Sequence, residues 1–271
     1  MPELPEVETT RRGVRPHVKG RTVERVIVRD GRLRWPVPPG LSRALAGATI
    51  DDVERRAKYL LFRTAHGTAI VHLGMSGSLR VLDAAVSPQK HDHVDLVLDD
   101  GKLLRLRDPR RFGCLLFTRA DPSEHPLLKE LGPEPLSSGF DGAHLHRRSR
   151  GRTAALKTFL MDAAIVVGVG NIYANEALWR ARLSPRRRAG RVTRAEFDEL
   201  ARRVKEVLAD AIERGGTTLR DFLSADGEPG HFRMALSVYD RAGKPCPRCG
   251  APIRAARVGQ RSAFFCPRCQ A

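Results

Sequence analysis

The first residues of the chain could supply an amine nucleophile. The sequence begins Met1-Pro2-Glu3-Leu4-Pro5-Glu6, and removal of the initiator Met would leave a secondary amine beside a carboxylate. A chain-terminal amine titrates near ~8, so part of it is unprotonated and nucleophilic at neutral pH. The acids here and the later Arg11, Arg12 and Arg15 predict that a helix begins at this point, whose positive end helps keep the amine neutral. Ordinary helix capping by Pro and acids is the alternative.

Four of the five cysteines predict a metal site. Two Cys-x2-Cys pairs lie near the end of the chain, at Cys246, Cys249, Cys266 and Cys269. Their spacing matches a tetrahedral four-thiolate zinc site on a β-hairpin, which leaves no open position, so the zinc would be structural. Arg254, Arg257 and Arg261 lie between the pairs and would be presented to phosphates. The fifth cysteine, Cys114, falls within a strand pattern and is expected to be a buried small hydrophobe.

A second candidate site is the run Gly168-Val169-Gly170-Asn171, which comes directly before a predicted helix. Glycines let a backbone approach a phosphate closely, and a helix N-terminus presents free N–H groups to it. Asn171 is predicted to cap the helix and to donate to the same anion. Residues 180–194 contain seven arginines and no acid. That run fits either a phosphate-binding surface or a solvated face.

Composition favours a polyanionic partner. The chain has 271 residues, a formal net charge of +17 and a pI of about 10.7, which suits nucleic acid. Arg outnumbers Lys 40 to 8, a bias that genome composition can also produce, so the charge alone does not prove DNA binding. No run of 18 apolar residues and no leader pattern occurs, which predicts a cytoplasmic protein without a membrane partner.

Two kinds of element must position these residues. Strand patterns occur at residues 21–29, 58–62, 69–73, 78–82, 94–98, 103–106 and 112–117. They predict an antiparallel sandwich or barrel up to about residue 120. Residues 132–139 have the composition of a linker, and helices are predicted beyond it at 153–162, 171–181 and 193–214. The last helix begins with a Thr193–Glu196 capping box and stops at Gly215-Gly216.

Together these features favour chemistry on DNA. An amine attacks an electrophilic carbon, and C1′ of deoxyribose is one when its base is leaving. The product would be a Schiff base, from which strand cleavage by elimination follows. The base must first leave the duplex, and another group must fill the gap.

The sequence resembles bacterial formamidopyrimidine-DNA glycosylases over essentially its whole length. The motifs are MPELPEVE at 1–8, RRAKYLL at 55–61, HLGMSG at 72–77, DPRRFG at 108–113, GVGNIYANEAL at 168–178, GGTTLRDF at 215–222 and the zinc finger. The resemblance implies an α+β multidomain fold with DNA in the cleft between its domains. An N-terminal antiparallel β-sandwich domain would cover residues 1–131 and a helical helix–two-turn–helix domain residues 132–240. A C-terminal zinc-finger β-hairpin with one structural Zn²⁺ would cover residues 241–271.

The resemblance also implies an activity. The enzyme would remove 8-oxoguanine and formamidopyrimidines from duplex DNA through a Schiff base on Pro2, followed by AP-lyase β,δ-elimination. Glu3 would be the acid/base and Lys58 a catalytic residue that holds a phosphate near the lesion. The implied DNA-binding residues are His72, Met75, His91, Arg110, Phe112, Arg152, Lys157, Asn171, Tyr239 and Arg261. The implied lesion-binding residues are Glu6, Thr217, Thr218 and Arg220.

Further implications concern the duplex and the cell. Met75, Arg110 and Phe112 match hole-filling residues, and a guanidinium fork suits the O2 and N3 acceptors of an orphaned cytosine. The enzyme is therefore expected to prefer lesions opposite cytosine. It is also expected to act as a monomer in the bacterial cytoplasm, associated with the nucleoid through DNA binding.

Two departures from the family pattern and two rival interpretations stay open. Asp240 stands where Gly is commoner, and Asn175 where an acid or Ser is frequent. A glycosylase of the endonuclease VIII type, acting on oxidised pyrimidines, is one rival, although Leu4 and the DPRRFG motif argue against it. The other is a non-catalytic zinc-finger protein that binds damage without cutting, against which Pro2, Glu3 and Lys58 argue.

Overall fold

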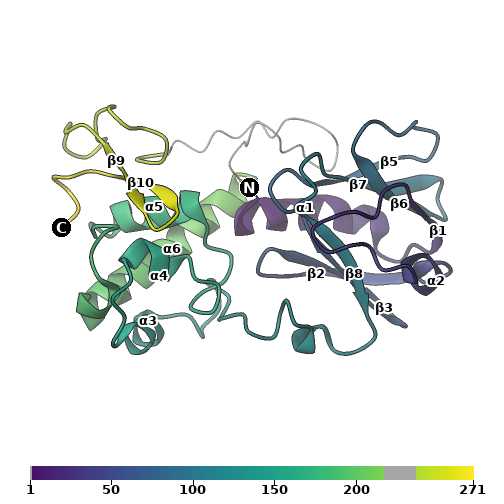
Figure 1. Cartoon of the computed structure of the whole chain (residues 1–271), viewed down its shortest axis with the longest axis horizontal. Helices are drawn as coiled ribbons and strands as arrows, with labels where there is room; N and C mark the ends of the chain where they lie inside the picture. Colours follow the sequence, from purple (N-terminus) through teal and green to yellow (C-terminus); the bar gives the residue numbers. More distant parts are fainter. Residues whose placement is uncertain (1, 217–235) are drawn as a thin grey trace. The chain divides into compact units, whose positions relative to one another are not determined.

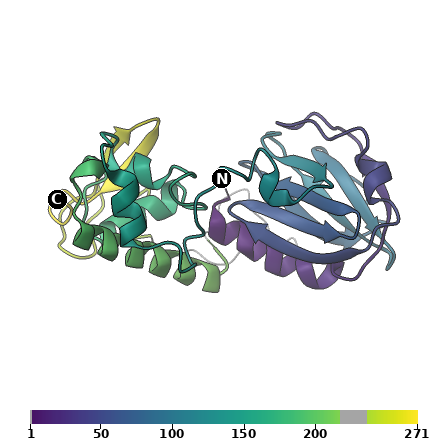
Figure 2. The ribbon, with the colours of Figure 1, turned by 90° about the horizontal axis from the view of Figure 1, so that it is seen from below.

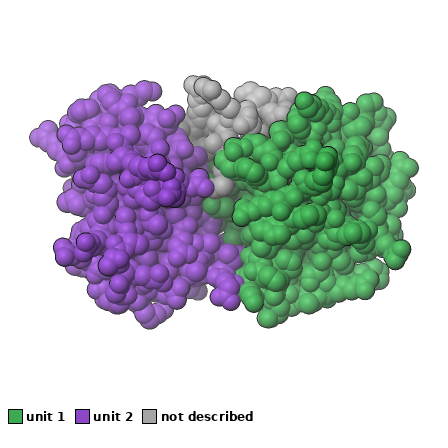
Figure 3. Space-filling view, in the orientation of Figure 1, with its two compact units in different colours: residues 1–129, 215–232 green, residues 130–214, 233–271 purple. Residues whose placement is uncertain are grey.

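The computed structural model describes residues 2–216 and 236–271, which form two compact units. Among these residues, the first unit comprises 2–129 with 215–216, and the second comprises 130–214 with 236–271 (Figure 3). No helix in the described part of the chain is long and apolar enough to cross a membrane.

The first unit is built on two four-stranded antiparallel sheets (Figures 1 and 2). One sheet has the order β1 (Val23–Val28), β6 (Asp92–Leu98), β7 (Lys102–Arg107) and β5 (Ser78–Asp83). The other has the order β2 (Ile50–Arg56), β3 (Tyr59–Thr64), β4 (Gly67–His72) and β8 (Cys114–Thr118). Side chains of both sheets, including Phe62 and Leu104, enter one hydrophobic cluster. The predicted antiparallel sandwich is confirmed.

Two α-helices and a 3₁₀ helix complete the described part of the first unit: α1 (Leu4–Val18), the short α2 (Leu41–Leu45) and η1 (Pro122–Glu124). The α1 helix buries Val7, Val14 and Val18 in the same cluster and packs against β2, β3 and β5. Strand β2 was not predicted. Only its Ile50 and Val53 are buried, so its sequence lacks the apolar alternation that marks a strand.

The second unit is helical and ends in a two-stranded hairpin. Its described elements are α3 (Gly142–Ser149), α4 (Leu156–Leu160), α5 (Asn171–Arg180), the 3₁₀ helix η2 (Ala189–Arg191), α6 (Arg194–Glu213), β9 (Arg254–Val258) and β10 (Arg261–Phe265). Helix α6 packs against α3 and α5, and its Thr193–Glu196 capping box is present as predicted. Helix α4 is shorter than predicted, because the residues before it pair with residues 187–189 through bonds such as Ala189 N–H to Ala154 O, 2.9 Å.

The segment predicted to be a linker packs within the second unit. Gly132 N–H donates to the carbonyl of Ala163 at 2.8 Å, and Val167 N–H donates to the carbonyl of Pro133 at 3.2 Å. A Cβ on Gly132 would lie 2.9 Å from the carbonyl oxygen of Ala164. The glycine and the proline therefore let the chain run close against the turn that precedes α5.

Candidate active site and nucleic-acid interface

The predicted nucleophile lies just before α1. Glu3 is the N-cap of the helix, and its N–H donates to Oε2 of Glu6 at 2.8 Å in a capping box. Pro2 is buried, and Glu3 and Glu6 are 2 % and 0 % exposed. Gly216, with a φ of +85°, lies against Glu6, because a Cβ there would be 3.1 Å from Glu6 Oε1. Two carboxylates therefore surround the start of the helix, where a secondary amine would need a proton acceptor.

The lesion-loop residues of the sequence prediction, Thr217, Thr218 and Arg220, lie outside the described residues. The described part of the first unit ends at Gly216, beside Glu6, directly before them.

Lys58 and His72 lie near each other in the first unit. Lys58 sits in the β2–β3 turn after Ala57, which has a φ of 55°. Burial, and after it repulsion from Lys58 and Arg34, lowers the pKa of His72 to about 4. The ring Nδ1 accepts from Gly74 N–H at 3.0 Å. At neutral pH the imidazole is therefore uncharged with its proton on Nε2, where it can donate to a phosphate oxygen.

Strand pairing brings the three predicted hole-filling residues into adjoining loops. Because β4 pairs His72 with Cys114, the residues after His72 lie beside the residues before Cys114. Phe112 is 43 % exposed, and the guanidinium carbon of Arg110 lies 4.9 Å from the centroid of its ring. Met75 is half-buried in the first of the two loops. An exposed aromatic ring backed by a cation suits insertion into a base stack.

A buried carboxylate that the sequence prediction missed joins these two loops. Asp108 is 0 % exposed. Its Oδ1 accepts from Ser76 Oγ at 2.9 Å and from Arg110 N–H at 3.3 Å, and its Oδ2 accepts from Gly113 N–H at 2.8 Å. The available signal was an acid at the start of the basic DPRRFG motif.

Two further contacts fix the second loop. Arg111, at a φ of 58°, forms an ion pair with Asp30 at 2.6 Å. His91, a predicted DNA contact, is half-buried and accepts with its carbonyl from Asp108 N–H at 3.1 Å. The backbone of His91 therefore lies beside the start of the segment that carries Arg110.

In the second unit, the glycine-rich turn leads into α5, and the N-cap of this helix lies one residue earlier than predicted. Gly170 is the N-cap, with φ −111° and ψ −160°, and Asn171 is the first helical residue. The prediction that Asn171 caps the helix is wrong, because the flexible Gly170 takes the extended cap conformation. The Oδ1 of Asn171 is buried without a hydrogen-bond partner in the described part of the chain.

The four hairpin cysteines fit a zinc ion. Their Sγ atoms all lie within 4.8 Å of one another, with Cys246–Cys269 at 4.0 Å and Cys249–Cys266 at 3.5 Å. Zn–S bonds of about 2.3 Å in a tetrahedron place sulfurs about 3.8 Å apart. The site therefore holds one structural zinc ion. The remaining cysteine, Cys114, is 0 % exposed in the core as predicted, and burial raises its pKa to about 12.

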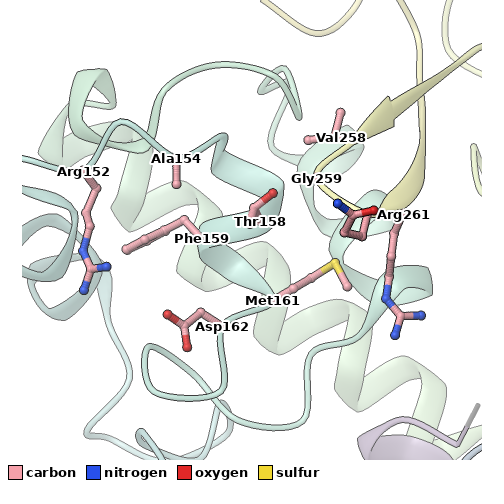
Figure 4. Close-up of a pocket in the computed structure, with 10 residues that line it drawn as sticks. Arg152, Ala154, Thr158, Phe159, Met161, Asp162, Val258, Gly259 and Arg261 are labelled. Atoms are coloured by element: carbon pink, nitrogen blue, oxygen red, sulfur yellow. The ribbon is translucent and has the colours of Figure 1, made fainter.

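The zinc hairpin and α4 line an open pocket of about 450 Å³. Phe159 and Met161 contribute apolar surface, while Arg152 and Arg261 lie on opposite sides of it (Figure 4). Lys157 is only 1 % exposed, and its Nζ donates to the carbonyl of Ser262 at 2.8 Å. Arg152 and Arg261 are thus exposed as a phosphate contact requires, whereas the Lys157 ammonium joins α4 to β10.

The segment 237–239 is also fixed on α5. The buried carboxylate of Glu176 accepts from the N–H groups of Ser237, Val238 and Tyr239, each at 2.9 Å. The Tyr239 ring meets the Phe264 ring edge-on, with centroids 5.2 Å apart. Tyr239, Arg261 and Asn171 therefore lie on segments that are packed around one helix.

Part of the arginine run serves the fold. Arg180 pairs with Asp210 at 2.8 Å, Arg187 with Glu196 at 2.6 Å, and Arg194 with Asp198 at 3.0 Å. The acidic partners lie in α6, beyond the end of the arginine run at residue 194. Half-exposed ion pairs contribute little to stability, so their main effect is to reduce the local positive charge.

Three family descriptions match the chain in order. The formamidopyrimidine-DNA glycosylase N-terminal domain matches residues 1–115, and the formamidopyrimidine-DNA glycosylase H2TH domain matches residues 131–223. A zinc finger found in FPG and IleRS matches residues 243–271.

Whole-chain relatives agree. The chain is 58 % identical over 270 residues to a formamidopyrimidine-DNA glycosylase of Methylococcus capsulatus, covering 100 % of both. It is similar to the solved MutM (Fpg) protein from Thermus thermophilus, with a TM-score of 0.88, 44 % identity, and 99 % and 98 % of the two chains covered. It is also similar to a Lactococcus lactis FPG mutant solved with Fapy-dG-containing DNA, with a TM-score of 0.90, 33 % identity and 99 % of both chains covered.

Proposed function

The chain belongs to the formamidopyrimidine-DNA glycosylase family, and from this premise we propose that the amine of Pro2 is its nucleophile. As a member, it is a base-excision-repair DNA glycosylase and AP lyase. The observation that carries the assignment is the placement of Pro2 beside Glu3 at the buried start of α1. Removal of Met1 is a requirement of the proposal, since an acylated proline nitrogen has no nucleophilic lone pair.

The proposed reaction begins at C1′ of the damaged deoxynucleotide, whose base is 8-oxoguanine or a formamidopyrimidine. The nitrogen of Pro2 forms a bond to C1′ while the glycosidic C1′–N bond breaks, and the base leaves with its electron pair and a proton. Opening of the C1′–O4′ bond gives an iminium ion. Loss of a C2′ proton then expels the 3′-phosphate, a second elimination expels the 5′-phosphate, and water releases the enzyme.

Glu3 is the proposed proton carrier of this sequence. The attacking amine must lose a proton, and O4′ must gain one when the sugar ring opens. A carboxyl group beside the amine can do both in turn. Lys58 and the Nε2–H of His72 would hold a phosphate next to the lesion, and Glu6 with Thr217, Thr218 and Arg220 would contact the everted base.

Borohydride trapping tests the nucleophile. With DNA that contains 8-oxoguanine, the wild-type enzyme should form a covalent complex through Pro2, because borohydride reduces the iminium ion to a stable amine. Pro2→Gly, or protein that retains Met1, should lose most of it. Intact-mass measurement must accompany each sample to report the N-terminus. Efficient trapping through a lysine when Pro2 is absent would overturn the assignment.

One further variant tests the role of Glu3, and two assays separate the rival functions. Glu3→Gln should bind damaged DNA normally but excise slowly, because a neutral amide carries no proton between steps. Faster excision of oxidised pyrimidines than of 8-oxoguanine would favour the endonuclease VIII type. Damage binding with no nicked product from a verified Pro2 terminus would favour the non-catalytic alternative.

The hole-filling role is proposed for Met75, Arg110 and Phe112. Phe112 would enter the stack as a wedge, Met75 would occupy the vacated space, and Arg110 would donate to O2 and N3 of an orphaned cytosine. Arg110→Ala should therefore flatten the preference for lesions opposite cytosine over adenine. Single-turnover excision opposite each base measures this, with Phe112→Ala as the comparison that slows excision opposite both. An unchanged preference in Arg110→Ala would remove the residue from the role.

The remaining parts of the proposal concern DNA contact and assembly. Contacts to the duplex backbone are assigned to His91, Arg152, Asn171, Tyr239 and Arg261. The buried Lys157 would support DNA binding by holding β10 beside α4. The proposal also includes domain boundaries after residues 131 and 240. The protein would act as a monomer and associate with nucleoid DNA. Footprinting of the DNA backbone in the complex tests the contacts, and sedimentation of the complex tests the monomeric state.

A further inference from the structure

Helix α5 carries an amide that bridges two segments of the second unit. Asn175 is 0 % exposed. Its Oδ1 accepts from the backbone N–H of Phe264 in β10 at 2.8 Å, and its Nδ2 donates to the carbonyl of Asn171 at 2.6 Å. One side chain therefore connects the first residue of α5 to the second strand of the zinc hairpin.

The chemistry of the two partners fixes both the orientation and the identity of this side chain. A backbone N–H can only donate and a backbone carbonyl can only accept, so the oxygen must face Phe264 and the nitrogen Asn171. An aspartate would keep the first bond but place an oxygen against the carbonyl of Asn171. A serine has one oxygen and a shorter side chain, so it cannot span both partners.

The two bridged segments carry separate proposed phosphate contacts. Asn171 follows the Gly168–Gly170 turn at the N-terminus of α5. Phe264 lies in the same five-residue strand as Arg261, and its ring packs on Tyr239. The neighbouring Glu176 holds the backbone of Tyr239. Consecutive residues of α5 thus fix the segments of three contacts.

We propose that Asn175 is a positioning residue that couples the DNA contact of Asn171 to that of Arg261. The bridge holds Asn171 and Arg261 at a fixed spacing. When Asn171 binds one phosphate, the neighbouring phosphates of the strand therefore reach Arg261 without further ordering of the hairpin. The inference rests on the proposed DNA contacts. It also assigns a use to Asn175, the position that departs from the commoner acid or Ser.

A double-mutant cycle measures this coupling. The probe is a duplex with a tetrahydrofuran abasic analogue, and anisotropy gives Kd for Asn171→Ala, Arg261→Ala and the double variant. In the native background the double variant should bind about fivefold or more tighter than the product of the single losses predicts, as for coupled sites. In the Asn175→Ser background, the losses in DNA affinity caused by Asn171→Ala and Arg261→Ala should simply multiply. Asn175→Asp should behave like Asn175→Ser.

The outcomes separate the possibilities. Zinc content and thermal melting of each variant report whether its fold is native. In Asn175→Ser and Asn175→Asp, the coupling must vanish while the zinc content and the melting temperature stay native. If the single variants weaken binding but the cycle is equally non-additive in both backgrounds, the positioning role is overturned and the DNA contacts stand. If the single variants bind normally, the contacts and the coupling both fail.

A measurement on the native Asn175 covers the case in which both of its variants lose zinc. DNA should slow hydrogen exchange at the Phe264 amide in wild type, and should slow it less in Asn171→Ala. Equal slowing in the two proteins would overturn the inference.

Discussion

Two buried carboxylates hold candidate DNA contacts in the two units, on different kinds of support. Asp108 accepts from Ser76 and Gly113 in loops that β4 and β8 bring together by their register. Glu176 accepts from three consecutive N–H groups beside a hairpin whose small cluster includes two of the metal-site cysteines. In the first unit, strand pairing in a large sandwich core brings the loops together, and the carboxylate then bonds one loop to the other. A small hairpin needs a metal to hold its strands in place.

Removal of a zinc ligand should produce the largest effect, and the structural damage should be confined to the second unit. Cys266→Ser should release zinc and disorder the hairpin around Arg261, which should weaken binding of lesion DNA by about two orders of magnitude or more. A chromogenic chelator reports the metal and anisotropy reports the binding. Arg261→Ala is the control, since it should retain zinc and reduce the slope of log Kd against log salt by about one. Normal DNA binding by zinc-free protein would contradict the comparison.

Asp108→Asn should give an intermediate effect in the first unit. The amide keeps the volume but turns one acceptor into a donor that faces Gly113 N–H or Ser76 Oγ, at a cost of about 1–3 kcal/mol in the free energy of unfolding. Urea unfolding measures the cost, and single-turnover excision should slow because Arg110 and Phe112 lose their fixed positions. Ser76→Ala is the milder companion variant. Unchanged stability and excision in Asp108→Asn would show that the strand register alone fixes the loops.

The pH dependence of His72 should be the smallest effect. Because the folded pKa is about 4, below the ordinary 6.5, the unfolded chain binds a proton before the folded protein does. Stability should therefore fall as the pH drops from about 6.5 to about 4, with no contribution from this group above that window. Melting temperatures at pH 7 and pH 5 should differ less in His72→Asn than in wild type. An equal difference in the two proteins would assign the loss to other groups.

Features written in local sequence were predictable, and features made by tertiary contact were not. The Thr193–Glu196 capping box and the paired cysteines each depend on fixed short spacings, so their patterns sufficed. Asp108, Glu176 and Asn175 act on partners 32, 62 and 89 residues away. No local pattern identifies such partners. The sequence prediction therefore found the groups proposed to touch DNA, but not the buried polar groups that hold them.

Two further errors concern helices: one cap was placed at the wrong residue, and one helix was missed. The sequence favours Asn171 as the cap because its side chain suits that position, yet Gly170 occupies it with an extended backbone. Helix α3 was not predicted, because its one large apolar residue, Leu145, is set among polar residues. Helix α3 begins at a local cap, because the Asp141 side chain accepts from His144 N–H at 2.7 Å.

The close approach of the two hole-filling loops sets a limit for protein engineering. A Cβ on Gly74 would lie 2.4 Å from the backbone carbon of Phe112, and one on Gly113 would lie 2.5 Å from the carbonyl oxygen of His72. Even alanine at either position would force the strand ends apart. Variants that read a different opposite base should therefore be sought by exchanging the side chains at positions 75, 110 and 112, while Gly74 and Gly113 are left unchanged.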